Sequence, residues 1–472
     1  MMPLGVVEQR QQPATPAWLA EICNGKVLRR GGRGGFRLGR FVIDSREVRK
    51  GDCFVALPGA RLDGHDFLAE ALGLGAAGVL VCQPISRTQL DSGAFVVRVD
   101  SSHAALLDLA AEHRRQHSAK VIGITGSCGK TSTKDMLGQV LSRYMPAVWS
   151  PRSFNNHVGV PLSLFQLRTE TKACVVEIGT NAPGEIADLV AVAQPDIGII
   201  TRVDESHLMR LGSLEGVAQE KSNLISGLAS DGLAILNGDD PTTALIRDLT
   251  SARLHEVRTN AEADWFATDI DDDGLDTSFR LQGETPVTLP RLGLHNVYNA
   301  LFTIAAAVEV GMPLDEIVAG LAEVPPTSRR LECKHLGDVS VIDDTYNANP
   351  ASARAALSVL SGLSVSGRRL VAFGEMLELG PRSEELHRAL GVDVAESGAD
   401  VLISVGEGAR PIAEAAVEHG MDGSAVHVLE NSVDAVAFLH TELRSGDWLL
   451  CKASRGVGLD SVVDGLEILL SE

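Results

Sequence analysis

One segment constrains the fold of this chain more than any other, because a strand, a glycine-rich loop and a helix follow one another directly. Lys120–Thr125 is an apolar strand-like run, and a helix with apolar residues at helical spacing begins at Lys130. Between them lies the loop of Ile122-Gly-Ile-Thr-Gly-Ser-Cys-Gly-Lys-Thr-Ser132. A strand that leads into a helix in this way is typical of parallel α/β sheets. The segment therefore predicts a parallel sheet with this loop at one edge.

The same loop has the composition of a phosphate-binding loop. Its backbone N–H groups can hold phosphates, the Lys130 ammonium can neutralise the β and γ oxygens, and the Thr131 hydroxyl can bind Mg²⁺. It departs from the usual pattern because position 124 is Ile and the first loop glycine is Gly126. No Asn-Lys-x-Asp sequence follows, so nothing indicates a GTPase. We predict an ATP site formed by Thr125, Gly126, Ser127, Cys128, Gly129, Lys130, Thr131 and Ser132.

The rest of the chain predicts three α/β domains. Its 472 residues suggest three domains at ~150 residues each. Short apolar runs alternate with helical segments almost throughout, which indicates parallel sheets covered on both faces. Residues 264–289 alternate more like antiparallel strands. We expect a first domain over 1–118, a central P-loop ATPase-type domain over 119–327 and a C-terminal Rossmann-like domain over 328–472. A helix expected over 102–117 ends the first domain, and its closing polar run, 112–119, is expected to be a linker.

Composition narrows the class of protein. Forty-two basic against 62 acidic residues give a net charge of −20, so nonspecific nucleic-acid binding by a broad basic surface is not expected. Seven cysteines lie singly, which predicts neither a disulfide framework nor a zinc site. No apolar run approaches the ~20 residues of a membrane span, and no signal-peptide core is present. We expect a cytoplasmic protein without a membrane span, and a monomer.

Two polar residues lie at the ends of apolar strands that follow the predicted loop in the sequence. Glu177 ends an apolar run, and His207 follows another that covers 197–201. The carboxyl ends of parallel strands open onto the ligand crevice, so both are candidate metal ligands beside the phosphate-binding loop. Taken singly, each is also compatible with an ordinary solvated loop residue.

Lys221 is the least expected residue in its segment. It lies four residues after Val217, on the apolar face of a helix predicted over 216–228. A lysine in this position can extend its ammonium to solvent along the helix surface. The alternative is a buried lysine whose pKa is lowered, so that its amine can react.

In the last third of the chain, Val341-Ile-Asp-Asp-Thr-Tyr-Asn-Ala-Asn-Pro350 leads from a strand into a helix. Asn349 is a suitable N-cap and Pro350 a suitable first helical residue. Those two requirements leave the polar residues at the strand end unexplained. Asp344 and Asn347 are therefore candidate functional residues.

With these motifs in view, the chain resembles the Mur ligase family, amide-forming enzymes of peptidoglycan synthesis. The resemblance runs from about Asp44 to about Asp460. It rests on Thr125-Gly-Ser-Cys-Gly-Lys-Thr, Asn155-Asn156 with Val158-Gly-Val-Pro161, Glu177-Ile-Gly, His207, Lys221, His295-Asn296-x-x-Asn299-Ala300 and Arg330. Within the family, Asp343-Asp-Thr-Tyr-Asn-Ala-Asn-Pro and Gly374-Glu-Met-Leu-Glu-Leu-Gly380 resemble the last-acting member. That member joins D-Ala-D-Ala to UDP-N-acetylmuramoyl-tripeptide.

The resemblance implies roles for most of these residues. Thr131 would hold one Mg²⁺, and Glu177 with His207 a second; Lys221 matches a lysine that CO₂ carbamylates in this family. The implied contacts of ATP and of the UDP-sugar substrate are His295, Asn296 and Asn299 for adenine and ribose, Arg330 for ATP from the third domain, Ser45, Arg46, Asp63 and His65 for the nucleotide-sugar, and Asn155 and Asn156 for the muramoyl group. Lys130, His207, Lys221 and Arg330 would be the catalytic residues. Asp344 and Asn347 would help to bind the acceptor dipeptide, with Arg455 at its carboxylate.

The expected activity is therefore ATP-dependent, ADP-forming ligation of D-Ala-D-Ala to UDP-N-acetylmuramoyl-tripeptide through an acyl phosphate. Another Mur-type ligase or a folylpolyglutamate-type ligase is the nearest alternative, and the Asp-Asp-Thr-Tyr-Asn-Ala-Asn segment speaks against both. A P-loop kinase or regulatory ATPase would form no amide bond. A UDP-sugar-binding protein without turnover would not need Lys130, Glu177, His207 and Lys221 together.

Overall fold

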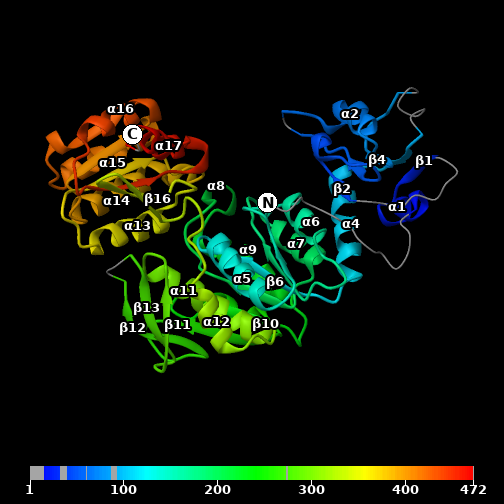
Figure 1. Cartoon of the computed structure of the whole chain (residues 1–472), viewed down its shortest axis with the longest axis horizontal. Coiled ribbons are helices and arrows are strands. Elements are labelled where there is room, and N and C mark those ends of the chain that lie inside the picture. Colours follow the sequence, from blue (N-terminus) through cyan, green and yellow to red (C-terminus); the bar gives the residue numbers. More distant parts are fainter. Residues whose placement is uncertain (1–14, 32–39, 60, 87–92, 273–274, 471–472) are drawn as a thin grey trace.

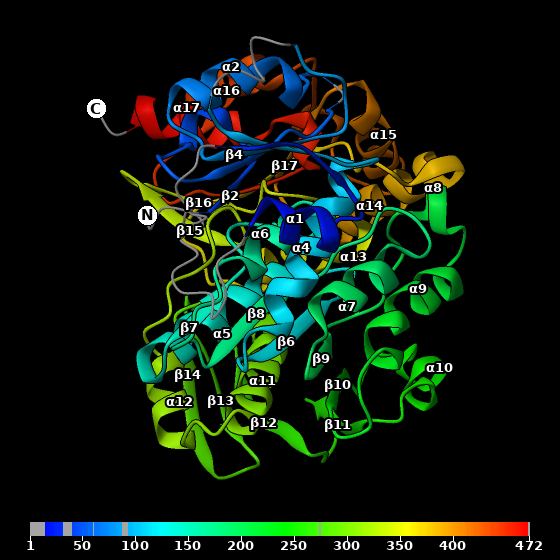
Figure 2. The ribbon, with the colours of Figure 1, turned by 90° about the vertical axis from the view of Figure 1, so that its right-hand side faces the viewer.

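The computed structural model describes residues 15–31, 40–59, 61–86, 93–272 and 275–470. Three sheets, each with helices packed against it, divide this part of the chain into three α/β domains (Figure 1). The first and third domains lie on the same side of the central domain, and Figure 1 shows them well apart from each other (Figures 1 and 2). None of the helices in the described residues is long and apolar enough to cross a membrane.

The first domain has a five-stranded sheet in the order β1-β5-β4-β3-β2. All neighbours are parallel except β1, which pairs antiparallel with β5 at one edge. Its elements are α1 (Pro16–Ile22), β1 (Lys26–Arg30), β2 (Phe41–Val42), β3 (Cys53–Val55), α2 (Leu68–Gly73), β4 (Gly78–Val81), β5 (Phe95–Arg98) and α4 (Ser102–Arg115).

The helix expected over 102–117 is present as α4, but its polar end is not the expected linker, because it docks on the central domain. The His113 ring is buried and its Nε2 lies 3.2 Å from the carbonyl oxygen of Leu167. The Arg114 guanidinium donates to the carbonyl oxygens of Ala193 and Gln194 and pairs with Asp196 at 3.0 Å. These charged and polar side chains are therefore partners of the next domain rather than a solvated connection.

The central domain has a nine-stranded sheet in the order β14-β13-β12-β11-β10-β9-β6-β8-β7. Strands β6 to β12 run parallel, and β13 and β14 pair antiparallel. The alternating pattern of residues 264–289 predicted these antiparallel strands. The strands are β6 (Lys120–Thr125), β7 (Ala147–Trp149), β8 (Ala173–Glu177), β9 (Ile197–Ile200), β10 (Leu233–Asn237), β11 (Arg253–Arg258), β12 (Trp265–Asp271), β13 (Thr277–Leu281) and β14 (Thr285–Leu289). The helices are α5 (Lys130–Tyr144), α6 (Gly159–Leu164), α7 (Glu185–Ala193), α8 (Leu208–Leu211), α9 (Leu214–Ser226), α10 (Thr243–Ile246), α11 (Leu294–Glu309) and α12 (Leu314–Leu321).

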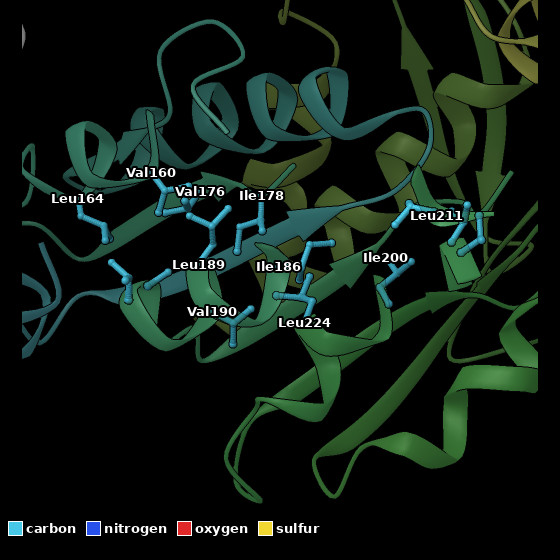
Figure 3. Close-up of a cluster of buried hydrophobic side chains, with 14 of the residues drawn as sticks. Val160, Leu164, Val176, Ile178, Ile186, Leu189, Val190, Ile200, Leu211 and Leu224 are labelled. Carbon is cyan, nitrogen blue, oxygen red and sulfur yellow. The ribbon is translucent and has the colours of Figure 1, made fainter. Parts of the chain in front are cut away.

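Helices on both faces bury the central sheet. Figure 3 shows side chains of β8 and β9, such as Val176 and Ile200, packed against Ile186 of α7 and Leu224 of α9. Residues on the other face pack against α5 and α11. Full burial of both faces explains why these strands are continuous apolar runs.

The third domain has a six-stranded sheet in the order β15-β16-β20-β17-β18-β19, parallel except for the antiparallel edge strand β15. The polar residues of β15 (Glu-Cys-Lys-His-Leu) hid this edge strand from sequence analysis. Helix α13 begins as predicted, with Asn349 as N-cap in a capping box with Ser352 and with Pro350 as its first residue. The elements are β15 (Glu332–Leu336), β16 (Val339–Asp343), α13 (Pro350–Gly362), β17 (Arg369–Gly374), α14 (Ser383–Glu396), β18 (Val401–Val405), α15 (Arg410–Glu418), β19 (Val426–Leu429), α16 (Ser432–Glu442), β20 (Trp448–Lys452) and α17 (Asp460–Leu470).

Candidate active site

The phosphate-binding loop connects β6 to α5 in the middle of the central sheet. Gly126 has φ 151°, and a Cβ there would come within 2.0 Å of Thr201 Oγ1, so only glycine fits. Gly129 is the left-handed N-cap of α5, at φ 81°. The Thr201 hydroxyl also donates to the Cys128 carbonyl at 2.5 Å, which holds the loop against β9. The loop thus presents the N-terminus of a 15-residue helix to an anion.

Lys130 and Thr131 lie at the start of that helix. Lys130 Nζ donates to the Gly126 carbonyl at 2.5 Å, and burial lowers the pKa of its ammonium, an effect that Glu177 opposes. The Thr131 hydroxyl accepts a hydrogen bond of 2.9 Å from Arg330 Nη2. Arg330 lies at the start of the third domain, so a guanidinium reaches the loop from across a domain boundary.

The backbone around Arg330 is strained. Arg329 and Leu331, on either side of it, have φ 60° and φ 50°, which non-glycine residues rarely adopt. The Arg330 guanidinium lies 4.2 Å from the centre of the Tyr346 ring, and that of Arg455 lies 5.6 Å from it. Such cation–π contacts fix the direction of a guanidinium. Sequence analysis did not assign this function to Tyr346.

Glu177 ends β8 beside the loop, as expected. Its Oε1 accepts from Asn155 Nδ2 at 2.9 Å, whereas its buried Oε2 has no hydrogen-bond partner among the described residues. An unpaired, buried carboxylate oxygen is costly unless a cation or a proton donor satisfies it. Asn156 instead caps the start of α6, since its Oδ1 accepts from the N–H groups of Val158 and Gly159.

His207 precedes α8 with φ 54°, and its Nδ1 lies 2.5 Å from Glu378 Oε2 of the third domain. Burial and the nearby Lys130 ammonium lower the pKa of the His207 imidazole. No cluster of three or more carboxylate, histidine or cysteine side chains suitable for a metal occurs in the described ranges. If Glu177 and His207 bind Mg²⁺, they therefore need further oxygen ligands from elsewhere to complete its coordination shell.

Lys221 lies on α9 and is only 2% exposed, so its ammonium does not extend to solvent as the alternative reading of the sequence supposed. Burial lowers the pKa of Lys221 well below its usual value, and the positive charge of Lys130 lowers it further. A neutral amine is nucleophilic, and it reacts with CO₂ to form a negatively charged carbamate with two oxygens. Mg²⁺ prefers oxygen ligands, and this set of residues could supply them: the Glu177 carboxylate, the Thr131 hydroxyl and such a carbamate.

A cavity of about 580 Å³ lies between the central and third domains. The phosphate-binding loop, α11 and the segment after β16 form its walls, whereas Lys130, Thr131, Glu177, His207 and Lys221 are not among its lining residues. Its lining includes Ser127, Cys128, Gly129, Ser132, His295, Asn299, Arg330, Asp344, Asn347 and Lys452. The geometry brings the predicted nucleotide and acceptor residues to one place.

On α11, the predicted adenine and ribose residues form one hydrogen-bonded chain. Asn296 Nδ2 lies 3.1 Å from His295 Nε2, and Asn299 Nδ2 donates to Asn296 Oδ1 at 3.0 Å. Asn299 also accepts from the Thr133 hydroxyl on α5. Burial and the positive charge of Lys452 lower the pKa of His295 to about 4, so its ring is neutral near pH 7.

The predicted acceptor residues have partners of their own. Asp344 Oδ2 accepts from Lys452 Nζ at 2.6 Å, and Lys452 also donates to the Asn347 carbonyl at 2.8 Å. Burial raises the pKa of Asp344, and Lys452 opposes this effect. The Asn347 residue is exposed, and Arg455 forms a loose ion pair of 3.4 Å with Asp460. Lys452 was not predicted, because nothing in a strand-ending lysine distinguishes it before the fold brings β20 beside β16.

In the first domain, the four predicted residues lie in or directly before two short 3-10 helices, Ser45–Glu47 and Gly64–Phe67, that follow strands β2 and β3. His65 Nδ1 lies 2.7 Å from Asp63 Oδ1, while its Nε2 accepts from the N–H of Cys82 at 3.1 Å. Ser45 Oγ donates to Glu70, and the exposed Arg46 pairs with Asp44. They are separate from the interdomain cavity, as a binding region for a different part of a substrate would be.

Comparisons with known proteins agree with this three-part division. Family profiles described as "Mur ligase family, catalytic domain", "Mur ligase middle domain" and "Mur ligase, glutamate ligase domain" match residues 40–114, 124–307 and 329–455. UDP-N-acetylmuramoyl-tripeptide–D-alanyl-D-alanine ligase of Bacillus subtilis is 35% identical over 425 residues, which cover 90% of this chain and 92% of the relative.

Solved structures give the same result. A crystal structure of MurF from Acinetobacter baumannii superposes with a TM-score of 0.87 at 32% identity, and the match covers 99% of this chain and 100% of that chain. MurF ligase from Thermotoga maritima, solved in complex with ADP, superposes with a TM-score of 0.80 at 27% identity and covers 91% of this chain and 97% of that one.

Proposed function

This chain belongs to the Mur ligase family, and we propose that it joins D-Ala-D-Ala to UDP-N-acetylmuramoyl-tripeptide with the conversion of ATP to ADP and phosphate. One observation carries this function. The phosphate-binding loop, the Arg330 guanidinium and the segment after β16 line a single interdomain cavity, in a chain that aligns with this ligase over 90% of its length.

The chemistry explains why such a cavity is needed. A peptide carboxylate is a poor electrophile because its charge is spread over both oxygens. Transfer of the γ-phosphoryl group of ATP to one oxygen gives an acyl phosphate, and attack by the amine of D-Ala-D-Ala then releases phosphate and forms the amide. The loop N–H groups, Lys130 and Arg330, which both contact the loop, would stabilise negative charge on the transferring group. The two domains around the cavity would exclude water, which otherwise hydrolyses the acyl phosphate.

We assign the metal-binding function to Thr131, Glu177 and His207, together with a carbamate at Lys221. Two Mg²⁺ ions held there would neutralise phosphate charge during the transfer. Support comes from the unpaired Oε2 of Glu177 and from the burial of Lys221, which favours a neutral amine. Lys130 is the positive group that a carbamate at Lys221 would balance, since it acts electrostatically on Lys221 and on His207.

We assign the remaining residues by their location. Those of the first domain, Ser45, Arg46, Asp63 and His65, would bind the UDP-sugar, and Asn155 with Asn156 the muramoyl part. His295, Asn296 and Asn299 would contact adenine and ribose. The dipeptide would be bound by Asp344 and Asn347, with its carboxylate at Arg455.

We place the domain boundaries at 118/119 and 327/328, between the matched profiles and at the junctions of the three sheets. We also propose that the protein acts in the cytoplasm, where UDP-linked precursors are made, and as a monomer.

A coupled phosphate-release assay tests the proposed function. The protein is offered ATP with a matrix of UDP-muramoyl peptides as donors and of amino acids or dipeptides as acceptors. We expect phosphate release only with UDP-N-acetylmuramoyl-tripeptide and D-Ala-D-Ala together. Release without either substrate would indicate a regulatory ATPase, and release with a single amino acid would indicate another ligase of the family.

A further inference from the structure

The loop after β17 contacts the segment that carries His207. Glu378 belongs to the Gly374–Gly380 sequence, and its Oε2 lies at hydrogen-bonding distance, 2.5 Å, from His207 Nδ1. The backbone carbonyl oxygen of Glu378 accepts from the N–H of Met209 at 3.4 Å. The two residues are 171 positions apart in the sequence. Figures 1 and 2 both show α8, which begins after His207, beside the third domain.

Two further contacts fix this junction. Arg382 forms an ion pair with Glu205, two residues before His207. Gly380 has φ 62°, and a Cβ there would lie 3.3 Å from Met209 Cα, so the two backbones approach closely. The third domain therefore docks on residues 205–209 through side chains and backbone together.

The loop is held from its own side as well. The N–H of Leu377 donates to Ser454 Oγ at 2.9 Å, and the N–H of Met376 donates to the buried His387 Nε2 at 2.8 Å. Glu378 is therefore presented by a structured loop, which lowers the entropy that its contact with His207 must overcome.

Both partners have a backbone conformation that non-glycine residues rarely adopt, with φ 54° at His207 and φ 66° at Glu378. Such a conformation is unfavourable unless its surroundings compensate. Residues of this kind concentrate at functional sites, and here two of them meet each other.

We propose that Glu378 is a positioning residue, which orients the His207 imidazole for a metal ion when the third domain is docked. The inference rests on the metal function assigned to His207 above. When Nδ1–H donates to a carboxylate, the lone pair of a neutral imidazole is on Nε2, which can then bind a metal. Docking of the third domain and completion of the metal site are thereby one event. This assigns a function to the Glu378 position of the Gly374–Gly380 sequence.

Mn²⁺ binding to the full-length protein with saturating ADP tests this inference, with free Mn²⁺ measured by electron paramagnetic resonance. The relevant site is the one that His207→Ala removes. We expect Glu378→Ala to weaken that site about tenfold, as is usual when a carboxylate behind a metal-bound histidine is lost. Glu378→Gln keeps an acceptor oxygen for Nδ1–H, so we expect it to retain more of the affinity.

Glu407→Gln is the matched control, because Glu407 is an exposed carboxylate of the third domain that pairs with Arg410 in its own domain. Melting curves of each variant check that it is folded. A folded Glu378→Ala protein that binds Mn²⁺ as tightly as the control, or more tightly, would overturn the inference. Phosphate release by the wild type is measured in parallel: its absence would refute the proposed function, whereas normal release with an unaffected Glu378→Ala site would refute the positioning role alone.

Discussion

Variants of Lys221 distinguish two hypotheses about this residue: that it forms a carbamate, and that it is only a buried lysine. If its carbamate supplies oxygens to the metal site, Lys221→Met and Lys221→Arg both remove them. Only Glu177, His207 and the Thr131 hydroxyl would then remain, and no third carboxylate or histidine clusters with them in the described part of the chain. Loss of metal charge stabilisation costs several kcal/mol, and about 4 kcal/mol corresponds to a 10³-fold loss of kcat.

The same substitution should act on stability in the opposite direction. Burial lowers the pKa of Lys221 in the folded protein, so between that pKa and the unfolded value of 10.5 the unfolded chain binds more protons. The stability of the CO₂-free wild type therefore rises with pH through this range. Methionine avoids the cost, and we expect Lys221→Met to stabilise by roughly 1–4 kcal/mol near pH 7, the range seen when buried ionic groups become apolar. The difference should disappear above pH 10.5.

Three measurements check this reasoning. Phosphate release is followed for wild type, Lys221→Met and Lys221→Arg, with Lys172→Met as the control because Lys172 is exposed in the same domain. Urea unfolding in CO₂-depleted buffer at two pH values gives the stability difference. CO₂ depletion should slow the wild type, bicarbonate should restore it, and acetate or formate should partly restore Lys221→Ala. An active Lys221→Arg enzyme would refute the carbamate, since arginine cannot form this group.

Four further variants test other parts of the site. Lys130→Ala should abolish phosphate release with an unchanged melting temperature, because we expect Lys130 to neutralise the phosphates of ATP; near-normal release would refute the ATP site. Asn347→Ala should raise the KM for D-Ala-D-Ala more than the KM for ATP, and an unchanged dipeptide KM would remove Asn347 from the acceptor site. Tyr346→Leu should lower ADP affinity by about 0.5–2 kcal/mol, measured by calorimetry, because Arg330 loses its aromatic partner, whereas Tyr346→Phe should retain it; equal effects would contradict the cation–π contact.

Local order in the sequence determined what could be predicted. The strand, loop and helix around Lys130 are contiguous, and helical spacing placed Lys221 on a buried face, so both were accessible without a structure. The strand ends at Glu177 and Asp344 were accessible for the same reason. Strand β15 was not predicted, because edge strands carry polar residues and so lack the apolar pattern of a buried strand.

Contacts between distant segments were not accessible. The pairing of Lys452 with Asp344 spans 108 residues, and that of His207 with Glu378 spans 171. Periodicity gives the face of an element but not the neighbour against which it packs. The polar end of α4 was predicted to be a linker for a related reason. His113 and Arg114 are charged or polar because they bind carbonyl groups of another domain.

The docking of α4 has a consequence for the length of the substrate. Since His113 and Arg114 fasten this helix to the central domain, the loops that hold Asp63 and His65 stay at a set separation from the phosphate-binding loop. If the first domain holds the UDP end of the substrate, the length of the attached peptide decides whether its carboxylate reaches the phosphate-binding loop. Each residue extends a chain by at most about 3.6 Å. A peptide that is one residue shorter would leave its terminal carboxylate about one residue length away from the phosphoryl group. That gap is about as large as the 3–3.5 Å within which reacting atoms must lie. Selection of a donor by its number of residues would follow from this spacing alone, without a contact to any particular side chain.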